Sequence, residues 1–259
     1  IIGDVSITGG IFVPAGSSLN IIGDGTLSVN SSTNQTYAIG SGFTMPYGNI
    51  SIAMDGKVFI HLDSEKSVAI GGRSNDDVSR IRIKCAELAI EQLGKSTLGI
   101  GSLLSGADVF IEDTRVKLVH HSKTALGIGS FSDPCSITMI SSSADITMSG
   151  DKIGGFGSYN SRGGCIRMSN DRITSIFKGK EILGIGADKE FGEIIMSDCT
   201  FDSTIEGASA VALGSSDCVG TINMRTCSGD IKVLAGEKTL LGVKPENLIS
   251  DRCGLKWTT

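Results

Sequence analysis

Apolar residues recur along this chain in short clusters that return at a nearly constant interval. The clearest cluster is a large apolar residue followed by glycine, as in Ile100-Gly101. A period this regular indicates a solenoid in which each repeat is one structural unit. The glycine of this anchor motif returns every 28 to 31 residues, at Gly40, Gly71, Gly101, Gly129, Gly157, Gly186, Gly214 and Gly242.

Each repeat contains two further clusters in which apolar and polar residues alternate, which places the apolar side chains on one face of a strand. One cluster pairs Ile50 with Ile52 in an early repeat and Ile194 with Met196 in a later one. The other cluster is looser, as in Val116 and Leu118. Methionines replace isoleucines at one repeat position, so we assign them to the core and not to a metal or heme site.

Three short strands in each repeat of about 28 to 31 residues predict an all-β fold, a right-handed parallel β-helix of about eight to nine coils. A solenoid of helix pairs does not fit, because glycine interrupts the apolar clusters every few residues. We expect the β-helix to span residues 1–244. Residues 245–259 are expected to form a C-terminal capping tail, in which Trp257 covers the last coil.

Small residues precede the anchor isoleucine, as Ala69 does before Ile70 and Gly99 before Ile100. If the isoleucine points inward, these small residues form a flat outward strip that a glycan chain could approach closely. Alternatively the anchor is a corner, where the second glycine supplies a positive φ. The pattern is compatible with both.

Composition narrows the function classes. The formal net charge is −5, so there is no basic stripe of the kind that nucleic acid requires. No apolar run approaches the ~20 residues of a membrane span. The chain begins without an initiator methionine or a signal peptide, which suggests a mature or excised fragment.

The seven cysteines contain no C-x-x-C pair, which argues against a zinc site or a disulfide scaffold. Cys199 and Cys227 lie one repeat apart and are expected to stack. Stacked strands are about 4.8 Å apart, within the range that a disulfide can bridge. Buried free thiols are the alternative.

The loops after the anchor vary most in length and carry aromatic and charged residues. Aromatic rings there could stack on sugar rings while polar groups bind hydroxyls or a cation. The alternative is that these loops pack on themselves. The candidate ligand-binding residues are Phe43, Tyr47, Arg73, Phe131, Tyr159 and Arg162.

The anchors, together with Ile21-Ile22-Gly23-Asp24-Gly25, resemble the Gly/Ile-rich repeat β-helix of surface and secreted proteins from anaerobic, gut-type bacteria, which are often labelled carbohydrate-binding. The chain departs from that pattern at Ala53-Met54-Asp55-Gly56, where the family has a Gly-Gly element. The resemblance implies an extracellular or cell-surface module, without catalytic residues, that binds a polysaccharide or host glycan. No cofactor is predicted, and a need for calcium is left open.

Two other functions remain as alternatives. A polysaccharide lyase or glycoside hydrolase would need clustered carboxylates beside a basic residue, which Glu112, Asp113 and Arg115 could supply. A structural or adhesin stalk would bind a host protein and no glycan. The low aromatic content of 5% favours the stalk over a glycan-binding module.

Overall fold

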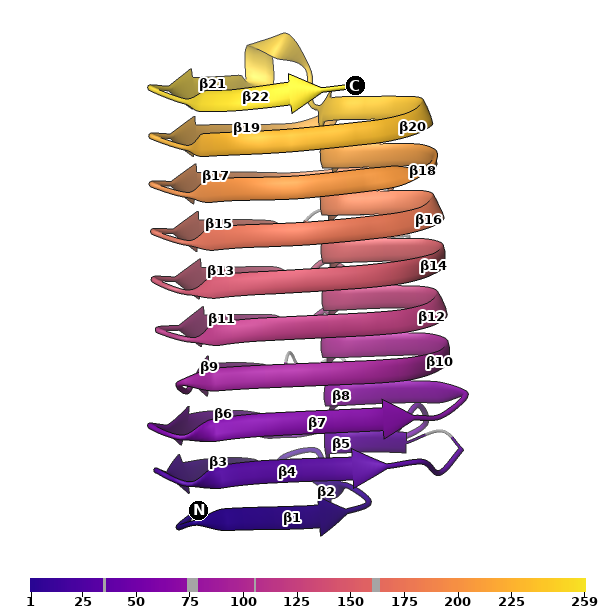
Figure 1. Ribbon diagram of the computed structural model, residues 1–259, viewed down its shortest axis with the longest axis vertical. Helices are drawn as coiled ribbons and strands as arrows, with labels where there is room; N and C mark the ends of the chain where they lie inside the picture. Colours follow the sequence, from indigo (N-terminus) through magenta and orange to yellow (C-terminus); the bar gives the residue numbers. More distant parts are fainter. Residues whose placement is uncertain (35, 74–78, 105, 160–163) are drawn as a thin grey trace.

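The chain winds into a parallel β-solenoid of about eight turns (Figure 1). The computed structural model describes residues 1–259 except 35, 74–78, 105 and 160–163. Every pairing between its named strands is parallel, as in β10 with β12 or β17 with β19. In the described part of the chain the helical content is a single 3₁₀ turn, η1 (Pro245–Asn247). The predicted all-β solenoid architecture is confirmed.

Two sheets make up the solenoid. The short-strand sheet has nine strands: β3 (Ser18–Gly23), β6 (Asn49–Met54), β9 (Arg80–Lys84), β11 (Asp108–Glu112), β13 (Ser136–Ile140), β15 (Cys165–Ser169), β17 (Glu190–Ser197), β19 (Val219–Arg225) and β21 (Leu248–Asp251). The other sheet has thirteen strands: β1 (Asp4–Thr8), β2 (Ile11–Phe12), β4 (Thr26–Ser31), β5 (Thr36–Gly40), β7 (Lys57–Asp63), β8 (Lys66–Gly72), β10 (Glu87–Ser102), β12 (Arg115–Ser130), β14 (Ser143–Ser158), β16 (Arg172–Ala187), β18 (Thr200–Ser215), β20 (Ser228–Gly242) and β22 (Gly254–Thr258).

The thirteen-stranded sheet is bent and supplies two of the three faces. From β10 onward one continuous strand curves around the corner in each coil, whereas β4 and β5, or β7 and β8, are separate strands in earlier coils (Figure 1). We call the part before the bend, together with β1, β4, β7 and β22, the long-strand face. The part after the bend, together with β2, β5 and β8, is the anchor face.

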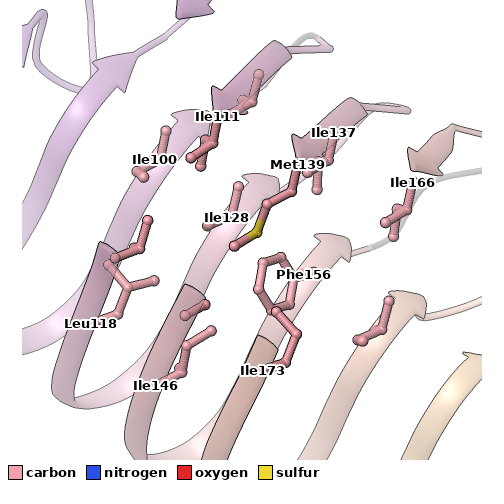
Figure 2. Packing of buried hydrophobic residues seen from close by; sticks show 14 of the residues in the cluster. Ile100, Ile111, Leu118, Ile128, Ile137, Met139, Ile146, Phe156, Ile166 and Ile173 are labelled. Carbon is pink, nitrogen blue, oxygen red and sulfur yellow. The ribbon is translucent and has the colours of Figure 1, made fainter. Parts of the chain in front are cut away.

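The interior consists of side-chain ladders, one per inward position. Ile100, Ile128 and Phe156 follow one another in neighbouring coils, and so do Ile111 and Met139 (Figure 2). These side chains are fully or almost fully buried. The methionines therefore pack in the core, as predicted, because a coil can bury its inward side chains only against the coils above and below.

The second glycine has a positive φ in every anchor from Gly40 to Gly214. Gly129 has φ of 145°, and a Cβ placed on it would lie 1.8 Å from the carbonyl oxygen of Gly157 in the next coil. The corner alternative is thus confirmed and the flat outward strip is wrong. The small residues before the anchor isoleucine are buried, and they leave room for core side chains: a Cβ on Gly155 would lie 2.7 Å from Cζ of Phe177.

One inward ladder contains a glutamine and a histidine. Gln92 and His120 stack between Leu62 and Met148, and both are fully buried. His120 Nδ1 lies 3.0 Å from Thr97 Oγ1, while its Nε2 and the Gln92 Oε1 have no hydrogen-bond partner in the structure. Burial, with a smaller effect of His121, lowers the pKa of His120 to about 3, so the imidazole is neutral in the folded protein.

The C-terminal tail extends the solenoid by a partial coil. After η1, β21 pairs with β19 and β22 pairs with β20, in the same register as the coils before them. Trp257 lies opposite Ile231 and packs, half-buried, against the core. The tail therefore covers the last full coil by continuing its ladders.

We predict that Gly129→Ala lowers the free energy of unfolding by at least about 2 kcal/mol, because alanine disfavours this φ and its methyl group would meet a backbone oxygen. Chemical denaturation monitored by circular dichroism measures the change. Gly254→Ala is the matched control, since a Cβ there meets nothing within 4 Å. Equal stability of the two variants would contradict the corner assignment.

We predict that His120→Met stabilises the protein in acid. The unfolded chain takes up a proton on this histidine near pH 6.5, whereas the folded chain does so only at about pH 3. Stability should therefore fall as the pH drops through this interval, by about 3 kcal/mol at pH 4. Urea titrations at pH 7 and pH 4 should show a smaller loss in the variant, and an identical loss would contradict the buried neutral histidine.

Candidate functional site

An outer layer covers much of the anchor face. Described residues that directly follow the anchors, such as Leu103 and Tyr159, pack over this face and bury a second apolar cluster on its outer side. Its buried members are Val68, Leu98, Leu103, Leu126, Tyr159 and Leu183. The anchor face is thus packed on both sides: its inner side contacts the core, and its outer side contacts this second cluster.

Two of the candidate tyrosines are buried. Tyr47 is 2% exposed and packs in the main core, where burial, together with the charge of Asp108, raises its pKa. Tyr159 is 3% exposed and packs in the outer cluster. In this structure neither ring offers a face on which a sugar could stack, which differs from the expectation of exposed platforms. The loops bury their aromatic residues because these cover the apolar outer side of the anchor face.

The remaining candidates lie at separate points of this layer. Phe131 is half-buried and stacks on Tyr159, with ring centroids 5.8 Å apart. Phe43 is half-buried with Lys66 Nζ 5.8 Å from its ring centroid, and the carbonyl of Arg73 accepts a hydrogen bond from the Tyr47 amide. Arg162 lies outside the described residues. Of the described candidates, Phe43 and Phe131 pack against the same outer cluster as Tyr159, whereas Tyr47 and Arg73 are joined through a backbone hydrogen bond.

The acidic cluster considered for catalysis takes part in ion pairs between coils. Lys84 Nζ lies 2.8 Å from Asp113 and 3.5 Å from Glu112, and Arg115 lies 3.5 Å from Asp145. Among the described residues, no group of three or more His, Cys, Asp or Glu side chains could hold a metal ion. The described chain also has no helix long and apolar enough to cross a membrane.

A different group of side chains surrounds a hollow of about 330 Å³ on the long-strand face. Phe59, Ala89 and Lys117 stack in one outward column, on β7, β10 and β12. The short side chain of Ala89 leaves a depression between the ring and the lysine. The adjoining outward column contributes Asn30, His61, Glu91 and Val119.

The hollow combines one aromatic ring with several hydrogen-bonding groups. Phe59 is 37% exposed, so part of its ring is accessible to solvent, as are several other large apolar side chains on the described surface. His61 Nδ1 lies 3.2 Å from a Glu91 carboxylate oxygen. Lys117 is exposed and forms no ion pair with any described residue, so its ammonium group is free to bind. Such a site can stack on a flat apolar surface while it donates and accepts hydrogen bonds.

A second hollow, of about 290 Å³, lies beside the outer layer at the C-terminal half. It is lined by Tyr159, Leu183 and Val211 among others. Its Lys152 is already engaged, at 3.8 Å from Glu181 and 3.5 Å from Asp188, with Nζ 4.7 Å from the Tyr159 ring centroid. The hollow around Phe59 is therefore the stronger candidate, because its ring and its cation are both available.

Sequence reasoning missed the hollow because it searched the loops and not the strands. Phe59 lies between the core residues Val58 and Ile60, and alternation places it outside. That signal was present in the sequence. Its neighbours Ala89 and Lys117 are 30 and 58 residues further on, so only the register of the coils shows that the three form one column.

No protein-family model, curated protein or solved structure matches this chain significantly. The case for a function therefore depends on the geometry of the molecule and on the character of its repeats.

We predict that Tyr159→Ala lowers the free energy of unfolding by about 3 kcal/mol, because it removes a ring packed in the outer cluster. Tyr159→Phe keeps the ring and removes a buried hydroxyl that has no hydrogen-bond partner in the structure, so it should leave stability unchanged or slightly higher. Thermal unfolding of both variants tests this. A stable alanine variant would contradict the packing role.

Proposed function

We propose that this chain is a non-catalytic β-solenoid module that binds a polysaccharide or glycan on its long-strand face, at the hollow around Phe59. The observation that carries the proposal is an exposed aromatic ring on a flat sheet, next to a depression above Ala89. The apolar face of a sugar ring fits such a surface, and Asn30, His61 and Lys117 can reach its hydroxyl groups.

The repeat character supports the same proposal. The Gly/Ile-rich anchors resemble those of surface and secreted β-helix proteins often labelled carbohydrate-binding, and we propose an extracellular or cell-surface location on that basis. We also propose that the candidate loop aromatics act in folding, since Tyr47 and Tyr159 are buried. The binding residues then lie on strands, where the coil register holds them in place.

A glycan and polysaccharide array on the purified chain, with calcium and with chelator, tests the proposal. For a glycan that binds, Phe59→Ala should weaken binding by about tenfold, the contribution expected of one aromatic stack. Phe110→Ala is the matched control. Phe110 is an outward aromatic residue on the short-strand sheet, and the Arg82 guanidinium lies 5.6 Å from its ring centroid.

Three results would contradict the proposal. Binding that survives Phe59→Ala and is lost in Phe110→Ala would place the site on the other sheet and overturn the assignment. Shortened glycan products would favour the lyase or hydrolase alternative. An array without any binding would reject the glycan module and favour the stalk that binds a host protein.

A further inference from the structure

The tight turn between the short-strand sheet and the long-strand face has the same form in successive coils. In each coil from Asp113 onward one residue takes a left-handed conformation, as Asn170 does with φ of 57° and Thr226 with φ of 55°. The side chain of the next residue accepts a hydrogen bond from a backbone amide of the preceding coil. The Thr114 amide donates to Ser142 Oγ at 3.1 Å, and the Ser142 amide donates to Asp171 Oδ1 at 2.7 Å.

The last three coils have cysteine at this turn position. Cys199, Cys227 and Cys253 stack, since the residues that follow them pair as Thr200 with Ser228 and Ser228 with Gly254. The Cys227 amide donates to Cys253 Sγ at 3.4 Å. Sulfur is a weak acceptor compared with the oxygen of Ser, Thr or Asp. Support of the turn therefore does not explain why three successive coils use sulfur.

The three thiols share one orientation. Each donates to the carbonyl oxygen two residues before it, with Sγ to oxygen distances of 3.2 Å for Cys199, 3.5 Å for Cys227 and 3.4 Å for Cys253. Identical side chains that stack in register on neighbouring parallel coils have Cα atoms about 4.8 Å apart, within the range a disulfide accepts. All three are free in this structure.

The three thiols differ in access. Cys199 and Cys227 are buried, whereas Cys253 is half-buried in the last partial coil. An oxidant in solution therefore reaches Cys253 first.

We propose that Cys253 and Cys227 form a reversible disulfide by exchange with a low-molecular-weight disulfide such as glutathione disulfide, and that this bond pins the last partial coil to the solenoid. The Cys253 thiolate attacks one sulfur of glutathione disulfide and releases one glutathione. The Cys227 thiolate then attacks Cys253 Sγ and releases the second glutathione. The two protons from the protein thiols end on the two glutathione molecules, so the exchange balances.

The bond joins the turn before β20 to the turn before β22, and these two strands pair with each other. It should therefore hold β22 against β20 and lower the frequency with which β22 separates from it. The proposal is independent of glycan binding, since the cysteines lie on a corner and the hollow lies on the long-strand face near the N-terminal half.

Oxidation with glutathione disulfide followed by tryptic digestion without reductant tests the pairing. Cleavage after Arg225, Lys232, Arg252 and Lys256 isolates Cys227 in residues 226–232 and Cys253 in residues 253–256, while Cys199 lies in residues 190–225. We expect residues 226–232 linked to residues 253–256. A link from residues 226–232 to residues 190–225, or glutathione left on Cys253 alone, would overturn the proposal.

Cys253→Ser is the informative variant, because serine supports the same turn in an earlier coil, as Ser142 does, and has no thiol. Oxidation should raise the melting temperature of the unaltered chain by on the order of 5 °C and slow amide exchange in β22. Both effects should be absent in Cys253→Ser and present in Cys218→Ser, whose thiol lies outside the stack. Loss of the effects in Cys218→Ser, or their persistence in Cys253→Ser, would contradict the mechanism.

Discussion

The anchor glycine with a positive φ, present from Gly40 to Gly214, is the constraint on which the rest of the solenoid depends. It turns the chain in every coil and brings its backbone against the next coil so closely that a Cβ would meet a carbonyl oxygen, at 1.9 Å between Gly101 and Gly129. Since only glycine tolerates both the φ and the contact, the position of each glycine fixes the register of its coil. The inward ladders, such as the one that runs from Ile100 to Leu213, follow that register, and so do the outward columns.

This constraint explains how much of the fold the sequence could predict. Glycine spacing fixes the coil length, and strict alternation at Ile81, Ile83 and their equivalents fixes which side chains point inward. Which anchor residues face the core was harder to predict, because strict alternation fails there. Gly99 and Ile100 are neighbours in the chain, yet both are buried towards the core. An irregularity of one residue in a strand changes the side of the sheet on which the following residues lie. The alternation of apolar and polar residues in the sequence does not reveal such an irregularity.

The candidate site was less predictable than the fold for a related reason. The loops were attractive because they vary and carry aromatic rings, yet the outer side of the anchor face is itself apolar, at Leu98 and Leu126 for example, and must be covered. Tyr159 serves that purpose. The exposed ring, Phe59, belongs to a strand that otherwise looks ordinary, and its importance comes from Ala89 and Lys117 in the two following coils. Columns of this kind can be read from a sequence only after the repeats are aligned in register.

Both proposals use positions that the solenoid leaves free. Alternation separates an outward side chain from the core, so the column of Phe59, Ala89 and Lys117 can change without disturbing the ladder of Val58, Leu88 and Val116 behind it. The residue type at the turn position can also vary, because the position requires only a hydrogen-bond acceptor. Both oxygen and sulfur accept a backbone hydrogen bond there. A fold whose stability resides in glycine corners and aliphatic ladders can therefore carry binding groups on its faces and redox-active thiols at its corners with little effect on its stability.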